Sequence, residues 1–221
     1  MLRAFAAGFF VLVALVSFAL AQAKGEWTVK APAPTKRTEV AAAAVKGKIY
    51  VVGGFQQGLS FITPAVEEYD PKTDTWRERA PLPGGLHHAG IGIVNDRLYV
   101  IGGFEHALLS IWSPVTSVYE YDPGADRWTV RKPMPTPRGA LAVTVLDGKL
   151  HAVGGYNRDG NTGAHEVYDP ATDTWSSRAP MPTAREPSPS LIKQMLGSSA
   201  RSMPSSVLIF SPARVRRTTM R

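Results

Sequence analysis

Three landmarks recur along the chain in a fixed order, and their spacing constrains the fold more than any other feature. A Gly-Gly pair ends an apolar run at 53–54, 102–103 and 154–155, and Tyr-Asp-Pro follows at 69–71, 121–123 and 168–170. Each of these tyrosines precedes a tryptophan by 7 residues, and each of the first three in-phase tryptophans precedes a Gly-Gly pair by 26 residues. Only the segment from Gly-Gly to Tyr-Asp-Pro varies, with 14, 17 and 12 residues. The pattern indicates a repeat architecture in which every unit carries one variable loop.

Each unit predicts four short antiparallel strands. Small residues dominate the first strand (40–45, 89–94 and 140–145), as expected where strands crowd around an axis, and the shared register overrides the helix preference of the alanines at 41–44. The pairs at 46–47, 95–96 and 147–148 tolerate positive φ and predict two-residue hairpin turns. Gly-Gly ends the second strand, where a missing Cβ permits close approach of a neighbouring sheet. Two prolines after each in-phase tryptophan predict a stiff link to the next unit.

This pattern resembles the kelch repeat, which forms one four-stranded blade of a β-propeller. The resemblance covers roughly residues 27–185 and implies an all-β fold, a partial kelch-type propeller with three four-stranded antiparallel blades at about 37–80, 86–132 and 138–179. Residues 26–29 are in phase with the fourth strand of a blade, so a closing-type strand is expected there. The resemblance implies a binding or scaffolding role and does not by itself imply catalysis.

The two ends of the chain differ from the kelch-like body at 24–186. Residues 1–23 combine a basic start, an uncharged apolar run and small residues at the exit, which predicts a signal peptide cleaved after Ala21 or Ala23. The alternative is an uncleaved membrane anchor, because 18 apolar residues are just enough to span a bilayer. Cleavage predicts a secreted or periplasmic protein without membrane contact. Residues 187–221 form a basic tail rich in Ser, Pro and Arg that lacks every landmark.

Charge and cysteine content exclude several classes of function. The leader and the tail hold the whole formal charge of +7, because residues 24–186 carry 18 Lys/Arg and 18 Asp/Glu. A body without a basic stripe does not favour a nucleic-acid partner. The absence of cysteine excludes disulfides, thiolate metal sites, a cysteine nucleophile and the cross-linked Cys–Tyr chemistry of galactose oxidase, a copper enzyme with kelch-like blades.

The histidines do not predict a metal site, and no cofactor is predicted. The five histidines include no His-x-His or His-x₃-His pair. His87 and His88 are adjacent, and on a strand they would point to opposite sides and could not ligate one ion.

Three blades are fewer than the about four to eight that usually close a propeller. Three explanations are open. In the first, the chain is a fragment or frame-shifted product of a longer propeller. In the second, two copies associate to complete a ring. In the third, the tail folds over an open blade face. The abrupt change of composition at Pro187 favours the first explanation.

The variable loops and the links between units are expected to share one end of the blades, because strand connections alternate ends. We expect this face to bind a protein or glycan ligand. Its loops also contain Trp112, which is out of phase with the other tryptophans. The residues predicted to contact the ligand are Arg37, Phe55, His87, His88, Phe104, Glu105, His106, Arg138, Tyr156, Asn157, Arg158 and Arg185.

An arginine follows the in-phase tryptophan by ten residues in three of the four units, at Arg37, Arg138 and Arg185, whereas the second unit has Leu86. Such an arginine could bind a carboxylate ligand at the mouth of the central funnel. The alternative is a structural arginine that binds loop carbonyls. A residue that recurs in most units favours the structural role.

Exported kelch propellers of the sialic-acid mutarotase (N-acetylneuraminate epimerase) type provide the alternative function, a carbohydrate-active isomerase. That function needs a carboxylate as general acid/base and an arginine to hold the sugar acid. Glu105 and Arg138 are the candidates for these two roles, with His106 in reserve. No distinguishing motif surrounds them, so we favour a non-catalytic binding module.

Overall fold

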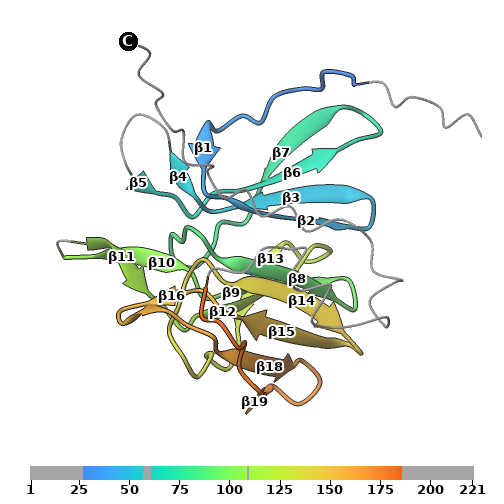
Figure 1. Cartoon of the computed structure of the whole chain (residues 1–221). Helices are drawn as coiled ribbons and strands as arrows, with labels where there is room; N and C mark the ends of the chain where they lie inside the picture. The colour runs from blue at the N-terminus through green and yellow to red at the C-terminus, as the bar shows by residue number, and fades with distance from the viewer. Residues whose placement is uncertain (1–26, 57–60, 109, 186–221) are drawn as a thin grey trace, which may run out of the picture. The chain divides into compact units, whose positions relative to one another are not determined.

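The computed structural model describes residues 27–56, 61–108 and 110–185. The chain divides into two units, 1–30 and 31–221, and all the described strands lie in the second. Three four-stranded antiparallel sheets form there, one from each repeat (Figure 1), which confirms the predicted all-β fold with three blades of a partial propeller. The described residues include no helix, and hence none that is long and apolar enough to cross a membrane.

Each blade follows the same order from its first strand to its fourth. Blade 1 consists of β2 (Ala41–Val45), β3 (Lys48–Val52), β6 (Val66–Asp70) and β7 (Thr75–Arg79). Blade 2 consists of β8 (Gly90–Val94), β9 (Arg97–Ile101), β12 (Val118–Asp122) and β13 (Arg127–Val130). Blade 3 consists of β14 (Ala142–Leu146), β15 (Lys149–Val153), β18 (His165–Asp169) and β19 (Thr174–Ser177).

A small hairpin extends from the loop between the second and third strands of every blade. The hairpins are β4 (Phe55–Gln56) with β5 (Phe61–Ile62), β10 (Phe104–Ala107) with β11 (Ser110–Pro114), and β16 (Tyr156–Asn157) with β17 (Gly160–Asn161). The short strand β1 (Arg37–Thr38) pairs with β4. The variable segments of the sequence therefore build paired strands that extend beyond the blades.

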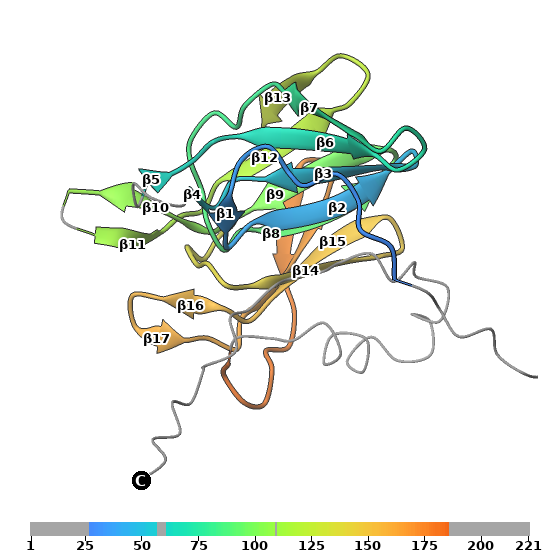
Figure 2. The same ribbon diagram turned by 90° about the horizontal axis from the view of Figure 1, so that it is seen from above.

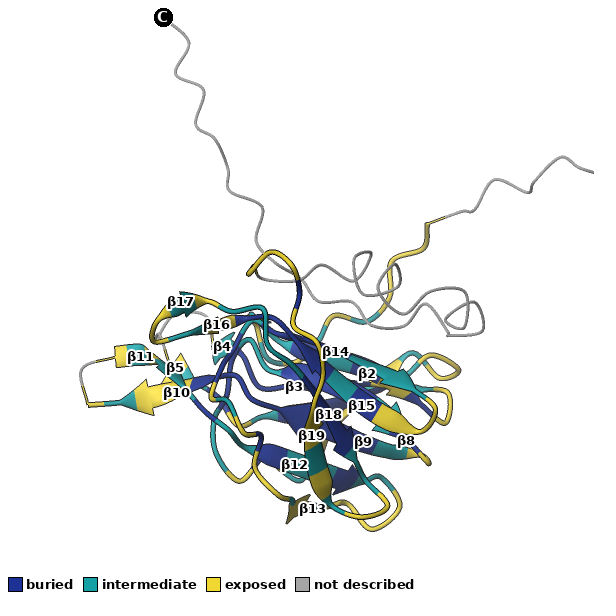
Figure 3. Cartoon of the chain, turned by 60° about the horizontal axis from the view of Figure 1, so that its bottom comes forward, coloured by how far each residue is buried: buried dark blue, intermediate teal, exposed yellow. Residues whose placement is uncertain are grey.

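The apolar core lies between neighbouring blades. The first strand of blade 2, β8, contacts both β2 and β14 (Figure 2), which explains the small residues in these strands. One buried cluster joins blades 1 and 2 around Tyr50, Ile91 and Tyr121, and a second joins blades 2 and 3 around Tyr99 and Tyr168. Figure 3 shows the result, with buried strands inside the blades and exposed residues at the turns.

The Gly-Gly pairs allow the blades to approach closely, as predicted. Gly53 has φ +65, and a Cβ at this position would lie 2.3 Å from the carbonyl oxygen of Leu86 in the next unit. Gly102 has φ +61, and its added Cβ would lie 2.5 Å from the carbonyl oxygen of Arg138. Both the positive φ and the close backbone contact require glycine.

The recurring tryptophan and an aspartate two residues before it fasten each blade to the link that precedes the blade. In blade 2, Trp128 Nε1 donates to the Ala80 carbonyl at 2.8 Å, and Asp126 accepts from the Ala80 N–H at 2.9 Å and from the Tyr121 hydroxyl at 2.5 Å. The equivalent sets are Trp76, Asp74, Ala31 and Tyr69 in blade 1 and Trp175, Asp173, Lys132 and Tyr168 in blade 3. Each indole N–H therefore bonds the backbone of the preceding link, in addition to the packing of its ring on the tyrosine of its own blade.

The predicted closing-type strand at 26–29 is wrong for the residues that the structure describes. The first strand begins at Arg37, and Trp27 and Val29 are fully exposed. A strand needs a hydrogen-bonded neighbour, and no partner strand lies among residues 27–56, 61–108 and 110–185. The predicted signal peptide and the basic tail lie outside the described residues.

Candidate binding site

Two of the arginines predicted to contact a ligand lie in buried ion pairs within their own blades. Arg138 Nη1 lies 2.6 Å from Glu166 Oε2, and the two side chains are 0% and 6% exposed. The guanidinium also donates to the carbonyl oxygens of Thr136 and Ala152. Burial lowers the pKa of Arg138, whereas the hydrogen bond that it donates to Glu166 opposes this shift. Arg37 makes the corresponding pair with Glu67 at 2.6 Å.

Blade 2 replaces both members of this pair together. Leu86 takes the place of the arginine and is 2% exposed, and Tyr119 takes the place of the glutamate and packs against the same cluster. A buried charge without its partner is strongly destabilising, so an apolar pair is the consistent substitute. These contacts support the structural role for Arg37 and Arg138, because their donors bind groups of the same blade.

The two groups of the alternative enzymatic site do not come together. Glu105 and His106 are exposed on β10, in the hairpin that extends from blade 2. The Arg138 guanidinium is buried against Glu166 in blade 3 and is not available to hold a sugar acid. The described geometry therefore offers no acid/base and arginine pair from these residues.

An aromatic cluster forms instead at the base of the hairpins. The rings of Phe55 and His87 are in contact, with centroids 4.1 Å apart and planes tilted by 40°. The Trp112 ring of β11 lies 4.9 Å from His87, 5.3 Å from Phe104 and 6.4 Å from Phe55. Trp112 is 51% exposed, so it covers the cluster and still offers a free face. Trp112 is not among the residues predicted to contact the ligand. The sequence could have indicated it, because it is out of phase with the other tryptophans.

The repeat itself builds this cluster, because an aromatic residue follows every Gly-Gly pair. Phe55, Phe104 and Tyr156 each pair with the link residue of their own blade through a strand or bridge contact. Phe55 then packs on His87 of the next blade, and Phe104 lies 6.5 Å from Tyr156 of the next. Blades 1 to 3 thereby contribute one continuous set of rings.

Exposed apolar side chains gather on these three hairpins. In Figures 1 and 2 the hairpin strands lie on the same side of the blades. Of the eight large exposed hydrophobic residues among those described, four lie on the hairpins. They are Phe61 (63% exposed), Leu108 (96%), Trp112 (51%) and Tyr156 (43%). An accumulation of apolar surface at one end of the blades marks a candidate binding surface, which we call the hairpin surface.

The two adjacent histidines differ from the prediction that they point to opposite sides. His88 has φ +52, so residues 87 and 88 do not continue as a strand. Their Nδ1 atoms are 2.7 Å apart, and the Nε2 atom of His87 bonds the Ile111 carbonyl at 2.7 Å. Burial lowers the pKa of His87. Burial also lowers the pKa of His88 to about 4, and the neighbouring His87 ring adds to this second shift.

The remaining predicted contacts lie at or near the third hairpin. Asn157 Oδ1 accepts from the Asp159 N–H at 2.9 Å and shapes the turn, while Arg158 is exposed at the tip. Arg185 is exposed, and its carbonyl accepts from the Gly155 N–H at 3.3 Å. These residues lie beside the aromatic cluster and do not belong to it.

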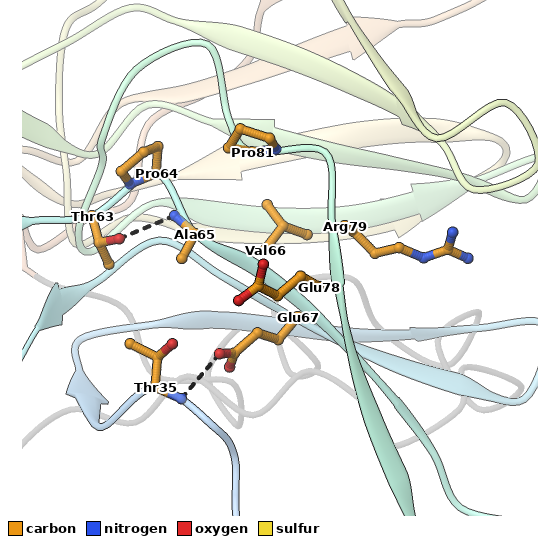
Figure 4. Close-up of a pocket in the computed structure, with 9 residues that line it drawn as sticks. All are labelled: Thr35, Thr63, Pro64, Ala65, Val66, Glu67, Glu78, Arg79 and Pro81. Atoms are coloured by element: carbon orange, nitrogen blue, oxygen red, sulfur yellow. Dashed lines mark hydrogen bonds between the residues drawn. The ribbon is translucent and has the colours of Figure 1, made fainter.

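A pocket of about 260 Å³ lies beside blade 1 (Figure 4). Its walls include Thr35, Glu67 and Arg79, and Glu67 accepts from the Thr35 N–H and from Arg37. Because these groups hold the link to blade 1, we do not assign the pocket to a ligand. No group of three or more His, Asp or Glu side chains that could hold a metal occurs among the described residues.

Comparison with known proteins gives the family. The Kelch motif model matches residues 36–83, 85–135 and 137–182, and the chain therefore belongs to the kelch-repeat family. Kelch-like protein 35 of Mus musculus is 34% identical over 137 residues, and Kelch-like protein 35 of Homo sapiens is 45% identical over 136 residues. Each match covers 62% of this chain, and the matched region spans about a fifth of each relative, 22% and 21%.

The solved structure of YjhT shares the fold. The TM-score is 0.63 at 23% sequence identity, and the match covers 73% of this chain and 58% of that one. At this identity the likeness supports the propeller fold alone.

Proposed function

We propose that this chain is a non-catalytic kelch-propeller module that binds another protein through the hairpin surface. The observation that carries the proposal is that Phe61, Leu108, Trp112 and Tyr156 are exposed on the three hairpins. Ring contacts from Phe55 to Trp112 and from Phe104 to Tyr156 join neighbouring hairpins. Tryptophan and tyrosine are enriched among the residues that dominate protein interfaces. The buried arginines do not offer the polar fork that an acidic sugar would need.

The test is a screen of the full chain against a displayed peptide library and a glycan array, followed by affinity measurement on the selected ligand. We expect peptide ligands, and we expect Trp112→Ser to weaken binding about 30-fold or more, because a buried tryptophan at an interface commonly contributes at least about 2 kcal/mol. The matched control is Val130→Ser, since Val130 is 68% exposed on β13, away from the hairpins. Ligands found only on the glycan array, or equal losses for both variants, would contradict the proposal.

We further propose that the module is exported and that its leader is removed. The charge-free run from Ala4 to Ala21 and the small residues at its end support this proposal. Expressed in a bacterial host, the full chain is expected to yield an exported protein that begins at Gln22 or Lys24, as determined by N-terminal sequencing. A chain without residues 2–23 serves as the control and should remain in the cytoplasm. An exported or membrane-bound product that retains Met1 would show that the leader is an anchor.

A further inference from the structure

The face of blade 3 that points away from blade 2 has no neighbouring blade among the residues that the structure describes. Each blade has one face toward the preceding blade and one toward the following blade, and we call the second the forward face. Val143, Leu150 and Tyr168 pack against blade 2, so the alternate residues of the same strands lie on the forward face of blade 3. Its apolar residues are Ala142, Val153 and Val167.

These apolar residues of the forward face are buried all the same. Ala142, Val153 and Val167 are 0%, 2% and 3% exposed, and they belong to neither of the two clusters that join the blades. The outer face of blade 1 also has no neighbouring blade in the described part of the chain, and there Ile49 is 37% exposed, whereas its counterpart Leu98 in blade 2 is fully buried. The difference points to a cover on the forward face of blade 3 that is not one of the three blades.

The forward faces of blades 1 and 2 present the same polar group to the blade that follows. In blade 1, Glu68 accepts from the Tyr50 hydroxyl at 2.6 Å and from Arg79 Nε at 2.7 Å. The Tyr50 ring lies 5.7 Å from the ring of Tyr121 in blade 2. The equivalent residues at the next junction are Tyr99, Glu120, Arg131 and Tyr168.

Blade 3 does not repeat this polar group. His151 and Val167 form the strand pair that Tyr50 and Glu68 form in blade 1, so both the tyrosine and the glutamate are replaced. His151 Nδ1 instead lies 2.9 Å from Nε2 of His165 on the neighbouring strand. The forward face of blade 3 therefore lacks the group that receives a following kelch blade at the other two junctions, which favours a cover of a different kind.

The chain leaves blade 3 along the path that leads to this face. The Arg185 carbonyl accepts from the Gly155 N–H at 3.3 Å, as the carbonyls of Leu86 and Arg138 accept from the Gly-Gly pairs of blades 1 and 2. Four residues after Leu86 and after Arg138, β8 and β14 begin, and each contacts the first strand of the preceding blade. On the same path, residue 189 reaches the corresponding position beside β14.

A second copy of the chain does not fit on this face. The link at 80–86 lies between two blades, held to blade 1 by the Leu82 N–H and to blade 2 by Trp128. Blade 1 already holds such a link at Ala31, and blade 3 already holds one at Met181. If blade 1 of one copy followed blade 3 of another, two links would occupy the place of one.

We propose that residues 189–194, Pro-Ser-Leu-Ile-Lys-Gln, lie along β14 and cover the forward face of blade 3 as a single extended segment. Leu191 and Ile192 supply the apolar side chains of this cover. Pro187 and Pro189 lack an N–H, so the segment has fewer donors to leave unpaired without a strand partner. Of the three explanations for the small number of blades, the contacts of blade 3 thus support a tail over an open blade face. The proposal does not depend on the hairpin surface or on its partner.

The experiment places a spin label on the full chain, which contains no cysteine, so that one introduced cysteine is labelled alone. With a nitroxide on Lys193→Cys, we expect the methyl NMR signals of Val153 and Val167 to be broadened beyond detection, relative to the reduced label. The signals of Ile49, on the outer face of blade 1, should keep their intensity. Thr219→Cys is the matched control, since it carries the same label near the other end of the tail and should leave all these signals intact.

Two further measurements separate the possible covers. Adding Leu191→Ser and Ile192→Ser to the labelled chain should return the signals of the forward face, because the apolar anchors are lost. Mixing isotope-labelled chains without a nitroxide with unlabelled chains that carry it on Lys193→Cys should leave every signal intact, because the cover belongs to the same chain.

Three results would overturn the proposal. Undiminished signals with the label on Lys193→Cys would show that the segment lies elsewhere, and equal broadening from Thr219→Cys would show only unspecific contact of the tail. Broadening in the mixture would assign the cover to a second copy. These readouts need no ligand, so failure of the binding screen above leaves them unaffected.

Discussion

Replacing Arg138 by leucine is expected to lower the free energy of unfolding by about 3–5 kcal/mol. The substitution leaves Glu166, which is 4% exposed, as a buried carboxylate without its cation, and removal of one member of a buried ion pair has a cost of this size. Urea unfolding followed by tryptophan fluorescence measures the change. Arg158→Leu is the matched control, because Arg158 is exposed at a hairpin tip and should change stability by less than about 0.5 kcal/mol.

The second unit of the chain supplies the compensating substitution. Leu86 and Tyr119 stand where blade 3 has Arg138 and Glu166, so Arg138→Leu combined with Glu166→Tyr should recover stability to within about 1.5 kcal/mol of the unaltered protein. A single variant that is as stable as the unaltered protein would show that the pair contributes nothing. A double variant that is less stable than the single one would contradict the equivalence of the blades.

Replacing Gly102 by alanine is expected to destabilise the protein by about 2–5 kcal/mol. A left-handed backbone conformation costs an alanine about 1–2 kcal/mol, and the new Cβ would lie 2.5 Å from the Arg138 carbonyl oxygen, which forces blades 2 and 3 apart. The free energy of unfolding in urea is again the measurement.

Gly148→Ala separates the two parts of that cost. Gly148 has φ +70, but no atom lies within 4 Å of an added Cβ, so only the conformational cost of about 1–2 kcal/mol remains. If Gly102→Ala and Gly148→Ala lowered the free energy of unfolding equally, the close approach of blades 2 and 3 at Gly102 would not contribute to the cost.

Much of the fold is predictable because each unit repeats the same local chemistry. Turn pairs such as Asn95 and Asp96 have the positive φ values, 49° and 60°, that a two-residue hairpin requires. The alanines of β2 form a strand despite their helix preference, since the register they share with β8 and β14 places them against a neighbouring blade. The prediction of a strand at 26–29 is wrong because the local sequence, although in phase with the repeat, does not supply a partner strand.

The candidate site was less accessible to prediction. The spacing of Arg37 and Arg138 marks them as special, but it does not reveal the glutamates about 30 residues away that neutralise them. Adjacent histidines alternate sides only on a strand, and the positive φ of His88 removes that premise. Trp112 breaks the period and carries the clearest local signal, yet its neighbours come from three separate segments.

The three described blades, the strands within each and the places where blades touch could be predicted from the repeat pattern, because glycine pairs, turns and tryptophans act within one unit or on the next. The three-dimensional arrangement was needed to show which charges are buried and paired, which rings contact one another at the base of the hairpins, and that Glu39 lies beside His88. These contacts join residues from different repeats through side-chain direction and burial, and neither property can be read from spacing along the chain.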